Sequence, residues 1–202
     1  RADLQMALYQ TAKDRSGITF KFGTAVHKAE DDAEGPVICH ADANSETQEI
    51  RALALIGADG VWSKTRQQVP GHSEAAYSGL TAYRATLPSS QVDAGLLKDT
   101  GLWLGPNAHL VHYPLCGGDT FNLVALVPEK WTEEGWAAKA DRQVLLGHFG
   151  KWAPSLRSLL AQPDTWLKWA LCGVDGTGTW THGRIALLGD AAHGMLPFAA
   201  QG

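Results

Sequence analysis

The sequence contains few cysteines and no metal-binding pattern. Its 3 cysteines, Cys39, Cys116 and Cys172, lie far apart, and none belongs to a Cys-x-x-Cys pair. This excludes a zinc ribbon or a dithiol redox pair, because such sites need closely spaced ligands, and no metal site is predicted. We interpret the three as buried thiols in a reducing cytoplasm.

An excess of positive charge is also missing. The chain has 17 Lys and Arg residues against 21 Asp and Glu residues, for a formal net charge of -4. Neither nucleic acid nor an anionic membrane is therefore expected as a partner, since both select basic surfaces. No apolar run reaches the roughly 18 residues that span a bilayer, and no signal peptide pattern is present, so we expect a cytoplasmic location.

The chain has no initiator methionine and no Gly-x-Gly-x-x-Gly turn of the kind that receives a pyrophosphate. It opens inside a helical pattern, where Leu4, Leu8 and Thr11 share one stripe, and it closes where a further helix is expected to begin. The stretch Gly176-Thr-Gly178 lacks the third glycine and the preceding strand of such a turn. We therefore expect an internal piece of a longer protein.

The first third of the chain is rich in strand patterns separated by polar and glycine-containing turns. Strands are predicted over residues 18–22, 24–30, 36–42 and 49–56, which together indicate a β-meander. The end of the last one, Leu53–Ile56, is apolar without alternation, which predicts a strand buried on both faces. A helix is predicted near Ser63, whose hydroxyl can cap the amide of Thr65 or Arg66.

From residue 77 the strand patterns become rich in aromatic and β-branched residues. Segments 77–87, 101–105, 109–115 and 120–127 predict a second, antiparallel sheet. A helical region is predicted over 141–162, interrupted at Pro154, and segment 165–171 leads through a glycine-rich turn to a final apolar strand over 184–188. The chain is thus expected to leave one layer and return to it.

Two apolar strands are each followed by a glycine and an aspartate, in Ile56-Gly-Ala-Asp59-Gly60 and in Leu188-Gly-Asp190. In open α/β sheets, ligands bind at the carboxyl ends of strands, where glycines let a ligand approach the backbone. A short carboxylate there can accept hydrogen bonds from the hydroxyls of a sugar or polyol. Each aspartate could instead simply cap a turn or a helix.

Taken together, these segments resemble the FAD-dependent aromatic hydroxylases, the class A flavoprotein monooxygenases, of salicylate hydroxylase type. Residues 57–66 resemble the second flavin motif of that family, and residues 188–197 with Gln201-Gly202 resemble the third. The opening Arg1-Ala-Asp-Leu helix and His109-Leu-Val-His-Tyr-Pro, followed by Gly117-Gly118, also match, so the resemblance covers the whole chain. The first, glycine-rich flavin motif of the family would lie upstream of Arg1.

The resemblance implies an α/β fold: a Rossmann-like FAD/NAD(P)-binding flavoprotein monooxygenase fold, incomplete here, with an α+β substrate layer. Residues 1–76 and 176–202 would belong to the FAD-binding domain, and residues 77–175 would form the substrate-binding antiparallel sheet with its helices. The implied activity is hydroxylation of a phenolic aromatic acid of salicylate or hydroxybenzoate type. FAD is the implied cofactor, NADH or NADPH the co-substrate and O2 the oxidant; a homodimer is a further expectation.

The resemblance also implies roles for single residues at the flavin. Asp190 would accept hydrogen bonds from the ribityl hydroxyls, and backbone amides of the third motif would face the isoalloxazine ring. Asp59 would lie near the adenosine and pyrophosphate and hold its turn, and Arg1 would reach the flavin. The predicted cofactor-binding residues are Arg1, Asp59, Gly189, Asp190, Gln201 and Gly202.

Strand alternation separates the candidate substrate residues. Side chains alternate with period two, so His109 and Tyr113 share one face of their strand, whereas His112 faces the other way. The resemblance implies that His109 and Tyr113 line the aromatic pocket, and that Pro197 borders the substrate. A base that stabilises the phenolate would be His109 or His112, acting with Tyr113.

Three alternatives remain at this point. Arg84 could bind a substrate carboxylate or project into solvent, and the solvent interpretation is favoured. The chain could be an FAD-free binding or regulatory module, in which the two Gly-Asp turns only close a sheet. An Asp190–His193 hydrolase is the weakest alternative, because the sequence has no Gly-x-Ser-x-Gly nucleophile elbow.

Overall fold

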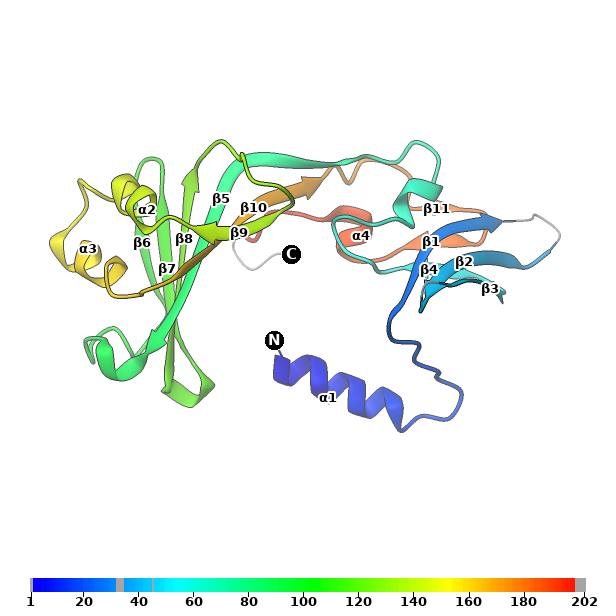
Figure 1. Ribbon diagram of the computed structural model, residues 1–202, viewed down its shortest axis with the longest axis horizontal. Coiled ribbons are helices and arrows are strands. Elements are labelled where there is room, and N and C mark those ends of the chain that lie inside the picture. Colours follow the sequence, from blue (N-terminus) through cyan, green and yellow to red (C-terminus); the bar gives the residue numbers. More distant parts are fainter. Residues whose placement is uncertain (1, 32–34, 45, 199–202) are drawn as a thin grey trace. The chain divides into compact units, whose positions relative to one another are not determined.

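The computed structural model describes residues 2–31, 35–44 and 46–198, and it divides into two compact units (Figure 1). Unit 1 spans the residues up to Ser73 together with Asp175–His193, and unit 2 spans Glu74–Val174 together with the residues from Gly194. Within the described ranges, no helix is both long and apolar enough to cross a bilayer. Each unit has a hydrophobic core of its own.

Unit 1 begins with helix α1 (Ala2–Lys13), which is followed by the predicted β-meander. The meander pairs β1, β2 and β3 antiparallel in that order, and a second sheet has the order β11-β12-β4. Strand β4 pairs with β12 in parallel, and the short helix α4 follows β12. The bounds are β1 (Thr24–Asp31), β2 (Val37–Ala43), β3 (Glu46–Ala52), β4 (Leu55–Gly57), β11 (Thr181–His182), β12 (Ile185–Leu187) and α4 (Asp190–His193).

Two strand predictions in unit 1 are wrong. Residues 18–22 form no strand, because Phe20 and Phe22 pack their rings on Tyr9 of α1, at centroid distances of 5.0 and 5.7 Å. Segment 49–56 is divided between β3 and β4, which belong to different sheets. Leu53 and Ile56 are 87% and 65% exposed rather than buried on both faces. Leu53 lies in the bend between β3 and β4, and Ile56 belongs to β4, which lies at the edge of its sheet.

The core of unit 1 joins the meander to the parallel strand pair. It also includes Val69, which follows the turn after β4, and Ala192 of α4. Both Gly-Asp turns are therefore attached to the same apolar cluster. The buried members are Ala29, Val37, Cys39, Val69, Ile185, Leu187 and Ala192.

Unit 2 is a six-stranded antiparallel sheet with the order β6-β7-β8-β5-β10-β9. The four predicted strands of this region are confirmed, whereas β9 was not predicted. The bounds are β5 (Ala75–Pro88), β6 (Gly101–Leu104), β7 (His109–Leu115), β8 (Thr120–Pro128), β9 (Ala137–Ala140) and β10 (Trp166–Val174).

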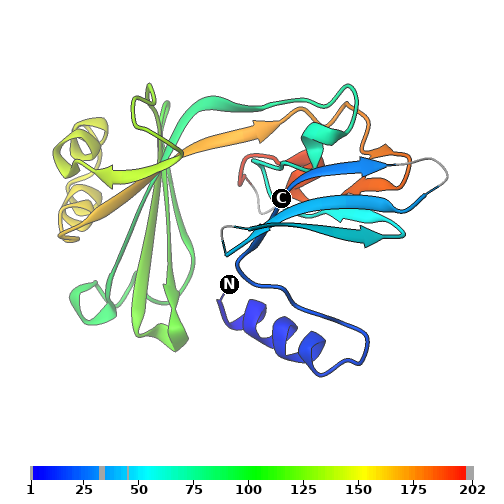
Figure 2. The same cartoon turned by 45° about the vertical axis from the view of Figure 1, so that its right-hand side comes forward.

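Helices α2 (Arg142–His148) and α3 (Pro154–Leu160) cover one face of this sheet (Figure 2). Asp141 caps α2 by accepting a hydrogen bond from the Gln143 amide at 2.7 Å, and Pro154 opens α3, where a missing N–H costs nothing. The predicted interruption of the helical region at Pro154 is therefore confirmed.

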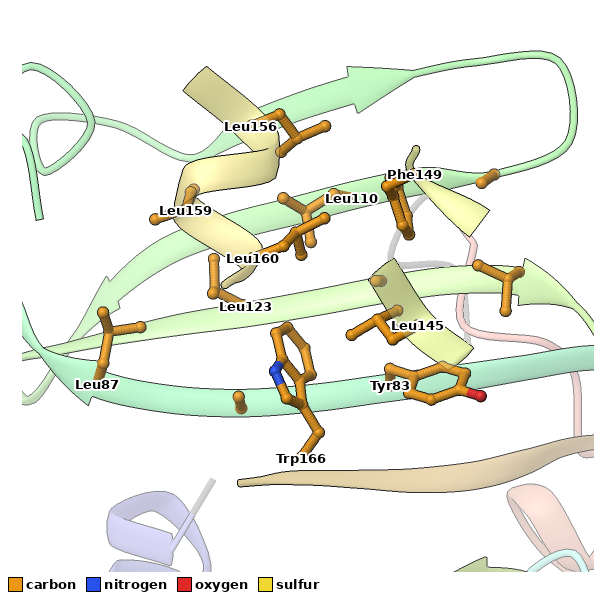
Figure 3. Packing of buried hydrophobic residues seen from close by; sticks show 14 of the residues in the cluster. Tyr83, Leu87, Leu110, Leu123, Leu145, Phe149, Leu156, Leu159, Leu160 and Trp166 are labelled. Carbon is orange, nitrogen blue, oxygen red and sulfur yellow. The ribbon is translucent and has the colours of Figure 1, made fainter. Parts of the chain in front are cut away.

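The core of unit 2 lies between these helices and the sheet (Figure 3). Helix residues such as Leu145 and Leu160 are fully buried, as are Tyr83 and Leu123 from the strands. The opposite face of the sheet, which we call the open face, is defined by the side chains of Ala82, Arg84, Thr86, His109, Val111, Tyr113, Asn122, Val124 and Leu126.

The cysteines differ in exposure, which corrects the expectation that all three are buried. Cys39 is buried in unit 1, Cys172 of β10 is half-buried, and Cys116 is exposed. Cys116 lies in the turn that connects β7 to β8, where its backbone has a positive φ of 52°. Its position in a hairpin turn, outside the sheet, accounts for the exposure.

Candidate active site

The segment that resembles the third flavin motif forms a tight turn between β12 and α4. Gly189 has a φ of 61°, in the left-handed region that glycine adopts without strain, and its carbonyl accepts hydrogen bonds from the amides of Ala192 and His193. This turn places Asp190 at the first position of α4 with its side chain exposed. A carboxylate in this position is available to a ligand.

Asp59, in contrast, uses its carboxylate within its own turn. Its Oδ1 accepts a hydrogen bond from Ser63 Oγ at 2.5 Å, and its Oδ2 accepts from the amides of Lys64 at 2.8 Å and Thr65 at 3.1 Å. Burial alone would raise the pKa of Asp59, but these hydrogen bonds outweigh burial and hold the pKa below its usual value. Asp59 thus shapes the loop that follows β4.

The predicted helix near Ser63 is wrong, although the predicted hydrogen bond of the Ser63 hydroxyl is present. Ser63 Oγ accepts a hydrogen bond from the Arg66 amide at 2.8 Å, and a 3₁₀ turn over Arg66–Gln68 takes the place of a longer helix.

Arg66 is a residue of this site that sequence reasoning missed. Its side chain is only 4% exposed, and the guanidinium donates to three carbonyl oxygens: those of Ser73 at 2.9 Å, Ala191 at 3.0 Å and Val61. Because Ala191 follows Asp190 directly, Arg66 joins the turn after β4 to the turn after β12. The one signal in the sequence is its place at the end of segment 57–66.

Residues 194–198 belong to unit 2 and approach its open face. The Gly194 carbonyl accepts a hydrogen bond from the Val174 amide at 2.7 Å, which anchors the segment at the end of β10. Pro197 is exposed, and the ring of Phe198 lies 5.8 Å from the ring of His109. Phe198 was not singled out in the sequence. The predicted site residues Arg1, Gln201 and Gly202 lie outside the described residues.

Strand β7 confirms the predicted alternation. His109 and Tyr113 are half-buried on the open face, whereas Leu110 is fully buried in the core on the other side. Burial lowers the pKa of His109, so its imidazole is neutral at pH 7 and can accept a proton.

His112 lies on the helix-covered face, away from His109 and Tyr113. It is 4% exposed, its ring is 5.1 Å from that of Phe121, and burial lowers its pKa. The ring packs on Gly101 so closely that a Cβ at that position would lie 2.0 Å from His112 Nε2. His112 also borders a pocket of about 370 Å³ together with Trp103.

Arg84 does not simply project into solvent. Its side chain is exposed, but Nε donates a hydrogen bond of 2.7 Å to Oδ1 of Asn122, which is fully buried. Both residues lie on the open face, and Asn122 stands directly opposite Tyr113 in the register of β7 and β8. Sequence reasoning missed Asn122, because a single polar residue within a strand carries no pattern.

Comparison with known proteins gives these features a family. The family model described as "FAD binding domain" matches residues 1–202. The chain belongs to this family. Membership of this family agrees with the interpretation of the two Gly-Asp turns as parts of an FAD-binding domain. It disfavours the alternative that the chain is an FAD-free binding or regulatory module.

Two of the relatives of this chain are aromatic hydroxylases. It is 34% identical to 3-hydroxybenzoate 6-hydroxylase 2 of Aquipseudomonas alcaligenes and 32% identical to 3-hydroxybenzoate 6-hydroxylase of Polaromonas naphthalenivorans, in both cases over 100% of this chain. It covers 62% and 50% of these relatives, so the chain spans about half the length of the curated relatives it matches. A solved salicylate hydroxylase substrate complex matches 98% of the chain with a TM-score of 0.81 and 28% identity, and 51% of that protein is covered.

Proposed function

We propose that the protein to which this chain belongs is an FAD-dependent monooxygenase that hydroxylates a phenolic aromatic acid of hydroxybenzoate or salicylate type, using NADH or NADPH and O2. The observation that carries the proposal is that His109 and Tyr113 lie on the same face of a sheet, the open face, while the other face is filled by the core. The similarity to 3-hydroxybenzoate hydroxylases over the whole chain supports the substrate class.

The residues of unit 1 fit a flavin cofactor. Asp190 is exposed at the end of an apolar strand, behind a glycine turn that leaves its carboxylate free to accept hydrogen bonds from ribityl hydroxyls. Asp59 and Arg66 hold the neighbouring turn in shape, and Gly189 sets the position of Asp190. Arg1, Gln201 and Gly202 remain predictions. FAD would supply the redox and oxygen-transfer chemistry when bound.

On the open face, His109 and Tyr113 would bind and deprotonate the phenol. The neutral imidazole of His109 accepts the proton of the substrate's hydroxyl group, and the loss of this proton makes the aromatic ring of the substrate electron-rich. The Tyr113 hydroxyl donates a hydrogen bond to the resulting phenolate oxygen. Pro197 would border the substrate from the segment that reaches His109. His112 takes no part in this proposal, because it faces the core.

The test compares two histidine variants of the full-length, flavin-loaded protein with the wild type. We expect His109→Ala to lower the rate of 3-hydroxybenzoate hydroxylation by about 10²- to 10⁴-fold while the flavin content stays unchanged, since a general base contributes that much. His148→Ala, at an exposed position on α2, is the matched control and should leave the rate unchanged. The wild-type rate should fall as the pH drops through the His109 pKa, which lies below 6.5.

Two results would refute the proposal. The first is a full-length protein that remains colourless and takes up no added FAD, as judged by its visible absorption spectrum. The second is a hydroxylation rate and pH profile that His109→Ala leaves unchanged, which would assign the proton transfer to another group. The proposal also includes a cytoplasmic location and a homodimer, and size-exclusion chromatography tests the dimer.

A further inference from the structure

The open face of unit 2 carries a second polar feature besides His109 and Tyr113. Asn122 is fully buried, yet its Nδ2 has no hydrogen-bond partner within the part of the chain that the structure describes. A buried amide group without a partner is unfavourable, and such groups in folded proteins call for an explanation, often a bound ligand or water. The unpaired amide group of Asn122 therefore indicates that a ligand or a water molecule binds nearby on the open face.

Strand register places Asn122 in the middle of a short polar row. It stands opposite Tyr113 on β7 and opposite Thr86 on β5, and Arg84 lies two residues from Thr86 on the same face. Arg84 Nε donates to Asn122 Oδ1 at 2.7 Å, so one edge of the guanidinium is fixed while the side chain stays exposed. The remaining N–H groups of Arg84 are available on the open face.

We propose that Arg84, held in place by Asn122, binds the carboxylate of the aromatic acid substrate. A guanidinium is planar and offers parallel N–H donors that match a carboxylate, and the bond to Asn122 fixes its orientation before the substrate arrives. Asn122 is a positioning residue in this arrangement, and Arg84 is the binding residue. The inference rests on the proposed function, because it assumes that His109 and Tyr113 bind the hydroxyl end.

The spacing of the strands suits a single substituted ring. Strand β8 lies between β5 and β7, so the backbones that carry Arg84 and Tyr113 are about 10 Å apart. In the proposed arrangement, one substituted aromatic ring lies above β8, with its hydroxyl toward Tyr113 and its carboxylate toward Arg84. A phenol without an acidic group would lack the second attachment.

The experiment measures the dissociation constants of 3-hydroxybenzoate and of the neutral 3-hydroxybenzamide in the full-length, flavin-loaded protein, through changes in the flavin absorption spectrum. We expect Arg84→Met to weaken 3-hydroxybenzoate binding by about 10- to 100-fold and to leave 3-hydroxybenzamide binding nearly unchanged, since one charged hydrogen-bonded contact is lost. Arg157→Met, at an exposed position on α3, is the matched control and should change neither constant.

Asn122 provides an independent variant. Asn122→Asp keeps the acceptor oxygen and the size of the side chain but adds a negative charge beside Arg84. We expect it to weaken binding of 3-hydroxybenzoate and to spare the amide. Should Arg84→Met fail to fold, Arg84→Lys retains a charge without the planar donor pair and should weaken acid binding to a smaller extent.

The outcomes separate this inference from the function on which it rests. Equal affinities of Arg84→Met and wild type for 3-hydroxybenzoate, or equal losses for the acid and the amide, would overturn the carboxylate site and leave the hydroxylase proposal standing. A wild-type protein whose flavin spectrum responds to neither compound, and which hydroxylates neither, would overturn the proposed function and this inference with it.

Discussion

Removing the Arg66 side chain should destabilise the protein strongly, although Arg66 is not expected to touch any substrate. In Arg66→Met, the carbonyl oxygens of Ser73, Ala191 and Val61 lose their donor in a region where the arginine itself is 4% exposed. Each such group costs about 1 kcal/mol or slightly more when it stays unpaired, so the sum is about 3 to 4 kcal/mol. A typical protein has a total stability of about 5 to 15 kcal/mol, so this loss is a large fraction.

The assay is thermal unfolding of the flavin-free protein, followed by circular dichroism. We expect a fall in melting temperature of roughly 10 °C for Arg66→Met. Arg66→Lys should lose less, because the ammonium can still donate to one or two of the carbonyls. Arg157→Met controls for the loss of an exposed arginine. A shift for Arg66→Met no larger than that of Arg157→Met would refute the idea that Arg66 fastens the two turns together.

Three further predictions concern the two units separately. Asp190→Ala should weaken FAD binding, measured by titration of the flavin-free protein, far more than Asp59→Ala does, because Asp59 spends its hydrogen bonds within its own turn; equal losses would contradict the assignment. Asp59→Asn should lower stability at neutral pH, and the difference from wild type should shrink as the pH falls through the folded-state pKa of Asp59, which lies below 3.8, since a depressed carboxyl pKa contributes stability only above it. Gly101→Ala should destabilise unit 2 by at least about 1 kcal/mol in urea unfolding, because the new methyl group would meet the His112 ring, and an unchanged midpoint would show that the ring can move.

The sheet of unit 2 was predictable because its signals are local. Alternation along β7 separated His109 and Tyr113 from His112, and the register of the structure agrees. Turn residues between the strands fixed their ends, and Pro154 marked the break between the two helices. Each of these signals depends on the residue itself and its immediate neighbours in the chain.

The remaining features depend on partners that are far away in the sequence. Phe20 and Phe22 have a strand-like pattern, but their contacts with Tyr9 of α1 decide their conformation. The apolar end of segment 49–56 looks the same whether a neighbouring strand covers it or not. Burial of Asn122 and of Arg66 comes from side chains and carbonyls brought together only by the fold, so their importance cannot be read from spacing.

The pairing of the two long strands of unit 2 also has a consequence for the order of folding. Ala75 at the start of β5 lies opposite Val174 at the end of β10, so unit 2 begins and ends at neighbouring points. The parallel pairing of β4 with β12 must wait until the ribosome has delivered residues 185–187, and closing so long a loop of unfolded chain is entropically costly. If unit 2 folds first, it shortens that loop to residues 58–73 on one side and 175–184 on the other. Folding of unit 2 would then bring the ends of β4 and β12 closer together, and slow steps in unit 2 would delay the pairing of these two strands.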